Sequence, residues 1–579
     1  MYRLNCRGMQ SLIDKALLIW YKLIMATIRK QKVGKYTYWQ IVESKRVNGK
    51  PRPFVLAHLG TADQLLCKLK KGPLKKTVKS YSYGSSYLLW KLAQEIGLLG
   101  MAERVFSGQE RAGLSVGKSL VLAAIHRALK PGSKNAFADF AKETALPQTV
   151  GFKAAALTSQ HFWDQMDTVT EAQIQQVEWE LTVKMAREGL LDPELLFYDL
   201  TNFFTCLATD NGRAELPKRG KNKQKRNDLR QFGLAQVVTR EFLIPVFTEV
   251  YEGNTPDEKR FIPFLTKLRQ RFAELNIKLE AITLVFDKGS NSKKNFGVLD
   301  RMEMAYVASV TASYHPDLLA VPWEEYHEVQ AGNKKLKCYR TRKTVWGKER
   351  TVVVYLSEKL RAGQIAGLHQ AIAKRLEALA QAVKSLESPR RKLKTREEIA
   401  AKAKAILKGA HAGVIDFTVG GRAGGGYGLS FSVNEAVYRH LTEEVFGKKV
   451  LVTCRDEWPE AEIIAAYCGQ SHVERVFRHF KNPYHHAVRP QYHWTDQKIR
   501  VHTFICVMGL LLSQLLWKKA RNLGYAMSVE DLLDRLTKVR KAEIVTISEI
   551  GGKPRREEVL EEMEPELAKL FSDLAQSVV

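Results

Sequence analysis

Three acidic residues stand where carboxylates could support phosphodiester chemistry. Asp199 lies inside an apolar, strand-like stretch, "LLFYDLTNFF", and Asp287 ends a second such stretch, "AITLVFD". Glu474 belongs to "YCGQSHVERVFRHFK", which runs from Tyr467 to Lys481. Three oxygen ligands from two strands and a helix suit Mg²⁺, which retains room for water and phosphate oxygens. Two such ions, with Mn²⁺ as an alternative to Mg²⁺, would serve in-line attack on a phosphodiester.

Each acidic residue also has an ordinary structural interpretation. Asp199 could cap a turn through Thr201 or Asn202, and Asp287 could be a simple turn aspartate. A charged helix face is commonly just solvated. However, side chains at strand ends often line sites in α/β sheets, and the two aspartates meet if their strands are neighbours. The combination therefore favours a metal site built from Asp199, Asp287 and Glu474.

The stretch from Tyr467 to Lys481 is predicted to be one amphipathic helix, at about 100° per residue. Its apolar side, suited to packing on a core, consists of Val473, Val476, Phe477 and Phe480. Its polar side combines the Glu474 carboxylate with groups that bind phosphate, namely Tyr467, Gln470, Arg478 and Lys481.

A strongly basic segment, Pro217–Arg230, follows the first strand. Its seven cations are Lys218, Arg219, Lys221, Lys223, Lys225, Arg226 and Arg230. Such residues can position a DNA duplex through its phosphates without reading its sequence. The alternative is a solvated, partly disordered loop.

The composition favours a polyanionic partner. The net charge is +29, from 91 Lys and Arg against 62 Asp and Glu, in 579 residues. Nucleic acid is the commonest such partner, and an anionic membrane surface or the ribosome are alternatives. The seven cysteines are scattered without a CxxC pair, which argues against a zinc ribbon or a disulfide framework and is typical of the cytoplasm. The sequence contains no HExxH spacing, so it does not indicate a histidine metal site.

Two apolar stretches are too short to span a membrane. Residues 11–25 contain a run broken by Lys22, and Met25 could be the true start of the protein. The uncharged run at 503–517 is predicted to be a buried core helix. We therefore expect no membrane partner.

The wider pattern predicts a mixed α/β core with additions at both ends. Residues 34–60 alternate around Asn48-Gly49, as in a β-hairpin, and residues 84–190 have helical periodicity. Three strands from Leu195, a helix and two further strands follow. We expect six regions: 1–80, an N-terminal β-hairpin region and basic linker; 81–190, a helical DNA-end-binding domain; 191–313, the first part of the core; 314–450, an insertion; 451–525, the second part of the core with the Glu474 helix; and 526–579, a C-terminal helical module.

The chain resembles the bacterial insertion-sequence DDE transposases that carry a tyrosine–arginine–glutamate–lysine signature. In that signature Arg follows Tyr after two residues, Glu follows after three more, and Lys after six more. Tyr467, Gln470, Glu474 and Lys481 keep this spacing, although Gln470 replaces the usual Arg and removes one expected phosphate contact. "FYDLTNFF" and "LVFDKG" resemble the family's two aspartate strands, and "VRPQYHWTDQKIRVHTFICVMGLLL" resembles its segment after the catalytic helix. The resemblance extends from about Gly34 to Trp517.

The resemblance implies a ribonuclease-H-like core with a large insertion between Asp287 and Glu474. It implies cleavage of DNA at the element ends, strand transfer into target DNA, two divalent ions and a homodimer on DNA. Tyr467, Gln470 and Lys481 would hold the DNA strand, and the helices at 84–165, or secondly the hairpin, would recognise the ends. The alternatives are a metal-dependent nuclease of the same fold and a catalytically idle DNA-binding regulator.

Overall fold

The computed structural model describes residues 26–70, 75–111, 113–207, 211–222, 225–275, 277–387, 395–422, 425–470, 473–482, 484–488, 491–547 and 554–578. The expectations for residues 11–25, for the choice between Met1 and Met25, and for Lys223 lie outside these residues. The chain divides into two compact units, which are taken separately below. One spans Met1–Tyr81 and Arg540–Glu562, and the other spans Ser82–Val539 and Met563–Val579.

The first unit contains the predicted hairpin. Strands β1 (Ala26–Val33), β2 (Tyr36–Val47) and β3 (Lys50–Thr61) form an antiparallel sheet in that order, and α2 (Ala62–Lys70) follows. Val47 pairs with Lys50 around Asn48 and Gly49, whose φ angles are 52° and 76°. Asn and Gly tolerate positive φ, so this dipeptide suits a two-residue turn. The hairpin is confirmed, and β1 is an additional strand that was not predicted.

A second sheet of this unit joins distant parts of the sequence. Its strands are β4 (Lys75–Ser82), β17 (Arg540–Ile547) and β18 (Arg555–Leu560), in the order β18-β17-β4. The segment 526–579 was expected to be helical, yet it supplies two of these strands. Its helices, α19 (Val529–Thr537) and α20 (Pro565–Ser577), flank them in sequence. Pairing with β4, far away in the chain, determines this structure and leaves little local signal.

The second unit is built on a mixed sheet of ten strands, which confirms the predicted mixed α/β class. The order is β11-β12-β13-β16-β10-β9-β5-β7-β6, with β8 paired to β7. The five predicted core strands are β5 (Leu195–Phe204), β7 (Arg230–Thr239), β8 (Pro245–Glu252), β9 (Thr283–Phe286) and β10 (Ala305–Val310). β9 lies between β5 and β10 and is parallel to both. The first and fourth core strands are therefore neighbours, which is the condition under which the two aspartates can meet.

The remaining strands of this sheet are β6 (Lys218–Arg219), β11 (His327–Ala331), β12 (Lys334–Val345), β13 (Lys348–Leu356) and β16 (Lys448–Thr453). Three of them, β11 to β13, fall within the segment 314–450 that was expected to be an insertion. They nevertheless extend the core sheet, because β13 pairs with β16. The sequence boundary at residue 314 thus separates strands that the structure joins.

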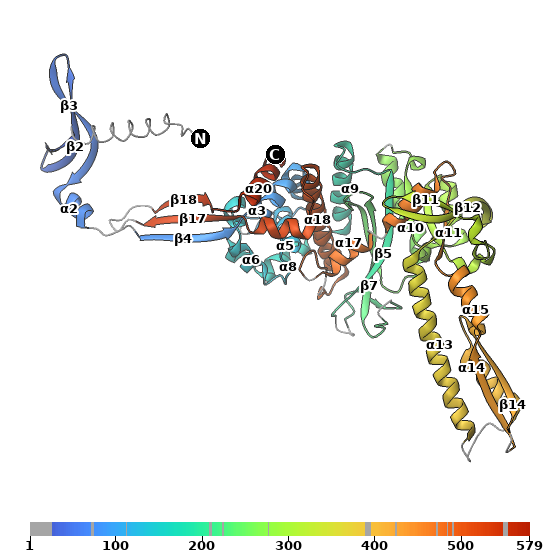
Figure 1. Cartoon of the computed structure of the whole chain (residues 1–579). Coiled ribbons are helices and arrows are strands. Elements are labelled where there is room, and N and C mark those ends of the chain that lie inside the picture. The colour runs from blue at the N-terminus through green and yellow to red at the C-terminus, as the bar shows by residue number, and fades with distance from the viewer. Residues whose placement is uncertain are drawn as a thin grey trace, which may run out of the picture. The chain divides into compact units, whose positions relative to one another are not determined.

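An arm with its own small core occupies the rest of that segment. It consists of α13 (Glu358–Glu387), α14 (Arg396–Leu407), β14 (Ile415–Gly421), β15 (Tyr427–Val433), α15 (Glu435–Arg439) and the π-helical turn η7 (His440–Val445) (Figure 1). Buried side chains such as Leu379, Ala403 and Val414 form its core. The predicted helical stretch at 357–407 corresponds to α13 and α14.

The two faces of the sheet carry different cores, because successive side chains of a strand alternate between faces. On one face, Tyr198 and Phe286 pack with buried residues of α10 (Asp257–Glu274) and α11 (Lys293–Met302). On the other face, Phe197 and Val285 belong to the core that includes α16 (Glu460–Gly469), α17 (Val473–Lys481) and α18 (Asp496–Asn522).

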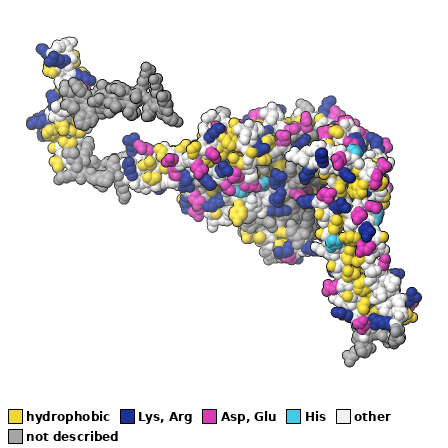
Figure 2. Space-filling view, in the orientation of Figure 1, with side chains coloured by type: hydrophobic (Ala, Val, Ile, Leu, Met, Phe, Trp, Pro, Cys, Tyr) yellow, Lys and Arg dark blue, Asp and Glu magenta, His cyan; other side chains and the backbone are white. Residues whose placement is uncertain are grey.

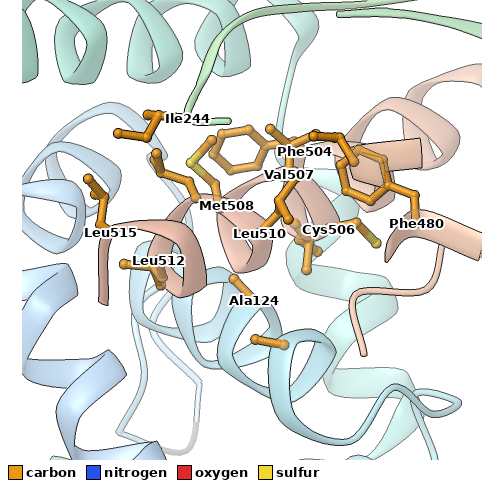
Figure 3. Close-up of a cluster of buried hydrophobic side chains, with 14 of the residues drawn as sticks. Ala124, Ile244, Phe480, Phe504, Cys506, Val507, Met508, Leu510, Leu512 and Leu515 are labelled. Atoms are coloured by element: carbon orange, nitrogen blue, oxygen red, sulfur yellow. The ribbon is translucent and has the colours of Figure 1, made fainter. Parts of the chain in front are cut away.

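Seven helices of the described residues between 84 and 187 contribute to the same core as α18 on this second face. They are α3 (Gly84–Glu95), α4 (Leu98–Val105), α5 (Val116–Leu129), α6 (Phe137–Glu143), α7 (Leu146–Val150), α8 (Ser159–Asp167) and α9 (Glu171–Arg187). Shorter elements of the unit are η1 (Ala154–Ala156), η2 (Leu279–Ala281), η3 (Lys288–Ser290), η4 (Ala312–Tyr314), α12 (Pro316–Leu319), η5 (Trp323–Glu325) and η6 (Ala412–Val414). Figure 3 shows the apolar side chains of α18 among neighbours that include Ala124 and Ile244.

Helix α18 is longer than the predicted core helix at 503–517. It has 27 residues, and an 18-residue window within it has a mean hydropathy of 1.7. By length and composition it is the one helix among the described residues that could cross a membrane. However, 94% of that window is buried inside the protein, which is what a core helix requires. The prediction of a buried core helix is confirmed, with longer bounds.

Candidate active site

A row of polar side chains crosses four neighbouring strands of the sheet. Asp199 on β5 pairs with Gln236 on β7. The last parallel pairs are Phe197 with Val285, between β5 and β9, and Phe286 with Ala308, between β9 and β10. If these registers continue for one or two residues, Asp199 lies beside Asp287, and Asp287 lies beside Ser309. Neighbouring strands lie about 4.8 Å apart. The two aspartates predicted from the sequence therefore occupy adjacent positions in one row.

Asp287 is held by neighbours from two other elements. Ser309 on β10 donates a hydrogen bond to Asp287 Oδ1 at 2.6 Å, and Tyr467 on α16 donates one to the same oxygen at 3.1 Å. Partial burial favours a raised pKa for this carboxyl, but these bonds, a bond from the Lys288 backbone and the charge of Lys449 outweigh it. The pKa of Asp287 is consequently below its ordinary value, and the group is a carboxylate near neutral pH.

Lys449 on β16 links this carboxylate electrostatically to the third acidic residue. Its Nζ lies 4.3 Å from the centre of the Tyr467 ring. Burial lowers the pKa of Lys449, and the charges of Asp287 and Glu474 act in the opposite direction. The charge of Lys449 therefore acts on Asp287 more strongly than on Glu474.

The prediction of a single helix from Tyr467 to Lys481 is wrong. Helix α16 ends at Gly469, and α17 begins at Val473. Gly469 lies so close to β5 that a Cβ atom there would be 2.5 Å from Cζ of Phe197. Close packing of α16 on the sheet therefore requires glycine here, and it brings this helix next to the strand of Asp199. Helical periodicity alone could not reveal this interruption.

Helix α17 has the predicted buried stripe. The exposed fractions of Val473, Val476, Phe477 and Phe480 are 0%, 0%, 5% and 0%. Figure 3 shows Phe480 beside Phe504 and Cys506 of α18. On the other side of α17, Glu474 and Arg478 are exposed. The apolar stripe is confirmed, and it presents Glu474 on the opposite side of the helix.

Two polar contacts further fix α17. Lys481 Nζ donates a hydrogen bond to Thr201 Oγ1 on β5 at 2.8 Å. His479 Nδ1 lies 3.0 Å from Glu530 Oε1 on α19, and this hydrogen bond lowers the pKa of Glu530 to about 2. The end of the Glu474 helix is therefore held by the strand of Asp199 and by the C-terminal part of the unit.

The first two signature residues do not face outward. Tyr467 and Gln470, both expected to contact DNA, are only 6% and 7% exposed. Tyr467 is directed to Asp287, and Gln470 Oε1 has no hydrogen-bond partner among the described residues. Tyr467 belongs to α16 and Gln470 directly follows it, so both are buried with the helix that packs on the sheet and neither lies on the α17 face that carries Glu474.

The basic segment 217–230 combines structural and exposed cations. Arg230 donates hydrogen bonds to the backbone oxygens of Pro217, Asn211 and Ala214, at 2.6, 3.0 and 2.6 Å. This guanidinium therefore organises the segment from within.

The other cations of this segment divide into two groups. Lys218 pairs with Glu252 at 3.1 Å, and Arg226 pairs with Asp228 at 2.8 Å. The exposed cations for which the structure gives no ion pair among the described residues are Arg219, Lys221 and Lys225.

The donor set fits a divalent cation, although the three acids do not converge in this structure. Among the described residues, no group of three His, Cys, Asp or Glu side chains is close enough to hold a metal ion. Asp199 and Asp287 are adjacent, whereas Glu474 is exposed on α17. Carboxylates, one of them held ionised, are the ligands that Mg²⁺ and Mn²⁺ prefer.

Three residues of the site were not predicted from the sequence. They are Ser309, Lys449 and Gln236, which lies fully buried beside Asp199 with neither side-chain amide atom hydrogen-bonded among the described residues. A polar residue inside an apolar strand was the available signal for Ser309 and Gln236, as it was for Asp199, whereas Lys449 stands at the start of β16 beside a second lysine. Only the sheet order shows that they flank the aspartates.

Comparisons with known proteins show the family of the chain. The model of the transposase DDE domain matches residues 192–508, and the model of the IS1634 family transposase N-terminal domain matches residues 24–83. No curated protein matches the chain. Among solved structures, the piggyBac transposase synaptic complex with hairpin DNA, determined by cryo-electron microscopy, is similar over 78% of this chain and 79% of that chain. Its sequence identity is 8% and its TM-score is 0.36.

Proposed function

We infer the activity of this chain from its family, because the chain belongs to the insertion-sequence transposases with a DDE domain. It is a DNA transposase. We propose that it cuts DNA at the ends of its own mobile element and joins the liberated ends to target DNA. Water would be the nucleophile for cleavage, and the liberated 3′-OH would be the nucleophile for strand transfer.

Asp199, Asp287 and Glu474 are the residues that we propose as catalytic. DDE transposases generally use divalent metal ions, and these three carboxylates would hold two of them, Mg²⁺ or Mn²⁺. Bound there, such ions would activate the attacking oxygen and stabilise the leaving oxygen. The alignment of Asp199 with Asp287 beneath the helix pair that carries Glu474 is the single observation that supports this assignment best.

The neighbouring residues would prepare the site. Tyr467 and Ser309 hold one oxygen of Asp287, which orients the carboxylate and keeps it ionised. Such outer contacts are important because they orient a metal ligand before it binds. Lys481 ties α17 to β5 and would place a positive charge close to the DNA strand being cut.

We propose a ribonuclease-H-like core for the sheet. The partial order β8-β7-β5-β9-β10 supports this, since β8, β7 and β5 are antiparallel neighbours and β5, β9 and β10 are parallel. We propose that a homodimer binds the two element ends on DNA and that it acts in the cytoplasm. The regions that we consider for end recognition are the helices at 81–190 and the hairpin at 34–60.

Two rival functions remain consistent with the same site. A metal-dependent nuclease would hydrolyse DNA without joining it, and an idle regulator would bind DNA without cutting it. The test is incubation of the full chain with Mg²⁺ and duplexes taken from both flanks of its gene. We expect nicking at the element ends and covalent joining to a target plasmid. Hydrolysis without joining would favour the nuclease, and binding without nicking would favour the regulator.

A further inference from the structure

We propose that one face of the β1–β3 sheet binds the phosphate backbone of double-stranded DNA. This inference rests on the proposed function and deepens it, because it assigns DNA affinity to a surface outside the catalytic region. We define the open face as Ile28, Lys30, Lys32, Trp39, Ile41, Glu43, Lys45, Lys50, Arg52, Phe54 and Ala57.

The charge of this sheet is the first observation. Residues 26–61 contain eight Lys and Arg but only one acidic residue, Glu43. All eight cations are exposed. Among the described residues, only Lys45 has an ion-pair partner, Glu43, at 3.4 Å. A small sheet with this excess of unpaired positive charge is suited to a polyanion.

The strand register separates the two faces. Directly paired residues share a face, so Lys30 lies with Trp39 and Lys45 lies with Arg52. Gln40 and Val42 point the other way and are only 6% and 5% exposed. The face of Gln40 and Val42 carries only the cations Arg29 and Arg46, whereas the open face carries five of the eight exposed cations.

Apolar side chains stand among the cations of the open face. Ile28 is 61% exposed and Phe54 is 46% exposed, and Lys45 Nζ lies 5.6 Å from the centre of the Phe54 ring. Figure 2 shows dark blue and yellow side chains mixed over this sheet. Cations can neutralise phosphates while apolar groups contact sugars or thymine methyl groups, and β-strands are known to enter DNA grooves.

The helices at 84–190 are a weaker candidate for this role. The segment contains eleven Lys and Arg and eleven Asp and Glu, so its net charge is zero. Helix α5 is buried at twelve of its fourteen positions, and α3 is buried at eight of twelve. These two helices, enclosed on most sides, cannot enter a major groove. Both charge and burial therefore favour the β1–β3 sheet for backbone contact.

Charge also favours DNA over a second copy of the chain as the occupant of this face. Two copies of a sheet with a net charge of +7 (eight cations and one anion) would repel each other if their open faces met. DNA supplies the opposite charge and releases counterions as it binds.

The test compares two triple variants of the full chain that remove equal charge. The open-face variant carries Lys30→Ala, Lys32→Ala and Arg52→Ala. The control carries Arg29→Ala and Arg46→Ala, on the opposite face, and Lys35→Ala, in the β1–β2 turn. Affinity for a mixed-sequence DNA duplex is measured across a salt series. Each phosphate contact contributes roughly 0.9 to the slope of log affinity against log salt, so the open-face variant should lower the slope by about 1.5–2.5 and the control by less than about 1.

Two results would overturn the inference. Equal slopes for the two variants would show that the open face has no special contact with DNA. A smaller assembly of the open-face variant in DNA-free sedimentation would show that the face binds a second copy instead. A second open-face variant carries Lys30→Gln, Lys32→Gln and Arg52→Gln, and thermal melting checks its fold. A lowered salt slope with an unchanged melting temperature attributes the loss to DNA contacts and not to unfolding. Cleavage by the wild-type chain tests the proposed function separately, since it can succeed when the slopes are equal.

Discussion

Asp287 is held by fixed hydrogen-bond partners, whereas the cations on the open face of the β1–β3 sheet project into solvent. Asp287 accepts hydrogen bonds from Ser309 and Tyr467, and the charge of Lys449 acts on it from a third element. On the open face, Lys45 alone has an ion pair among the described residues. Chemistry requires a carboxylate held in one position, while phosphate binding tolerates long, flexible side chains. We therefore expect cleavage and DNA affinity to be separable by mutation.

The largest effect should come from the three carboxylates. Asp199→Ala, Asp287→Ala and Glu474→Ala should each abolish cleavage, because metal ligands have no substitute in this chemistry. Binding should persist, since cations supply most of the affinity for DNA. Cleavage assays and affinity titrations on the same duplexes measure both properties. A Glu474→Ala chain that cleaves at nearly the wild-type rate would refute the site assignment.

Substitutions on the two sides of α17 should differ almost as strongly. Val476→Asp places a charge among fully buried side chains and should lower the free energy of unfolding by about 4 kcal/mol or more. Lys481→Ala should leave the fold intact and reduce cleavage more than affinity. Thermal melting and cleavage assays compare them. The opposite pattern, with Lys481→Ala unfolded and Val476→Asp unaffected, would contradict the orientation of this helix.

Loss of the tyrosine hydroxyl tests how far the site depends on its supporting contacts. Tyr467→Phe removes one hydrogen bond to Asp287 and keeps the ring, so cleavage should fall by about 10–100-fold with DNA affinity unchanged. Tyr427→Phe, at a 41% exposed tyrosine of the arm, is the matched control and should cleave normally. Equal rates for the two variants would mean that this bond does not position Asp287.

The basic segment at 217–230 should behave like the open face, but within the catalytic region. Replacing Lys221, Lys223, Lys225 and Arg226 with Ala should lower the salt slope by about 1–3, below the limit of about 3.6 for four contacts. The loss should be equal for element-end and unrelated duplexes, because phosphates carry no direct sequence information. A loss confined to element-end DNA would instead indicate contacts with bases. An unchanged slope would indicate that the segment is a solvated loop without phosphate contacts.

The smallest effect concerns the ion pair that ties α17 to α19. His479 lowers the pKa of Glu530 to about 2, below the unfolded value of about 4.3. A depressed carboxyl pKa stabilises the fold above the unfolded pKa, and this stability is lost as the pH falls through the folded pKa. Glu530→Gln should therefore lower the urea midpoint at pH 5, and its difference from wild type should shrink toward pH 2. A difference that persists unchanged at pH 2 would exclude the ion pair as its origin.

The sequence by itself determined the local features of this protein. Alternation around Asn48-Gly49 predicted the hairpin, apolar runs located the strands of Asp199 and Asp287, and residue spacing identified the transposase signature. The buried stripe of α17 also followed from its periodicity. These features are local, because each depends on residues only a few positions apart.

The tertiary structure decided which of these local features meet. Strand order placed Gln236, Ser309 and Lys449 around the aspartates, although Lys449 is 162 positions from Asp287 in the sequence. Packing of α16 on the sheet placed Gly469 against Phe197 and Tyr467 within hydrogen-bond distance of Asp287. Pairing of β13 with β16 drew part of the expected insertion into the core sheet. Such contacts depend on packing between distant segments, and the spacing of residues within a single segment does not predict that packing.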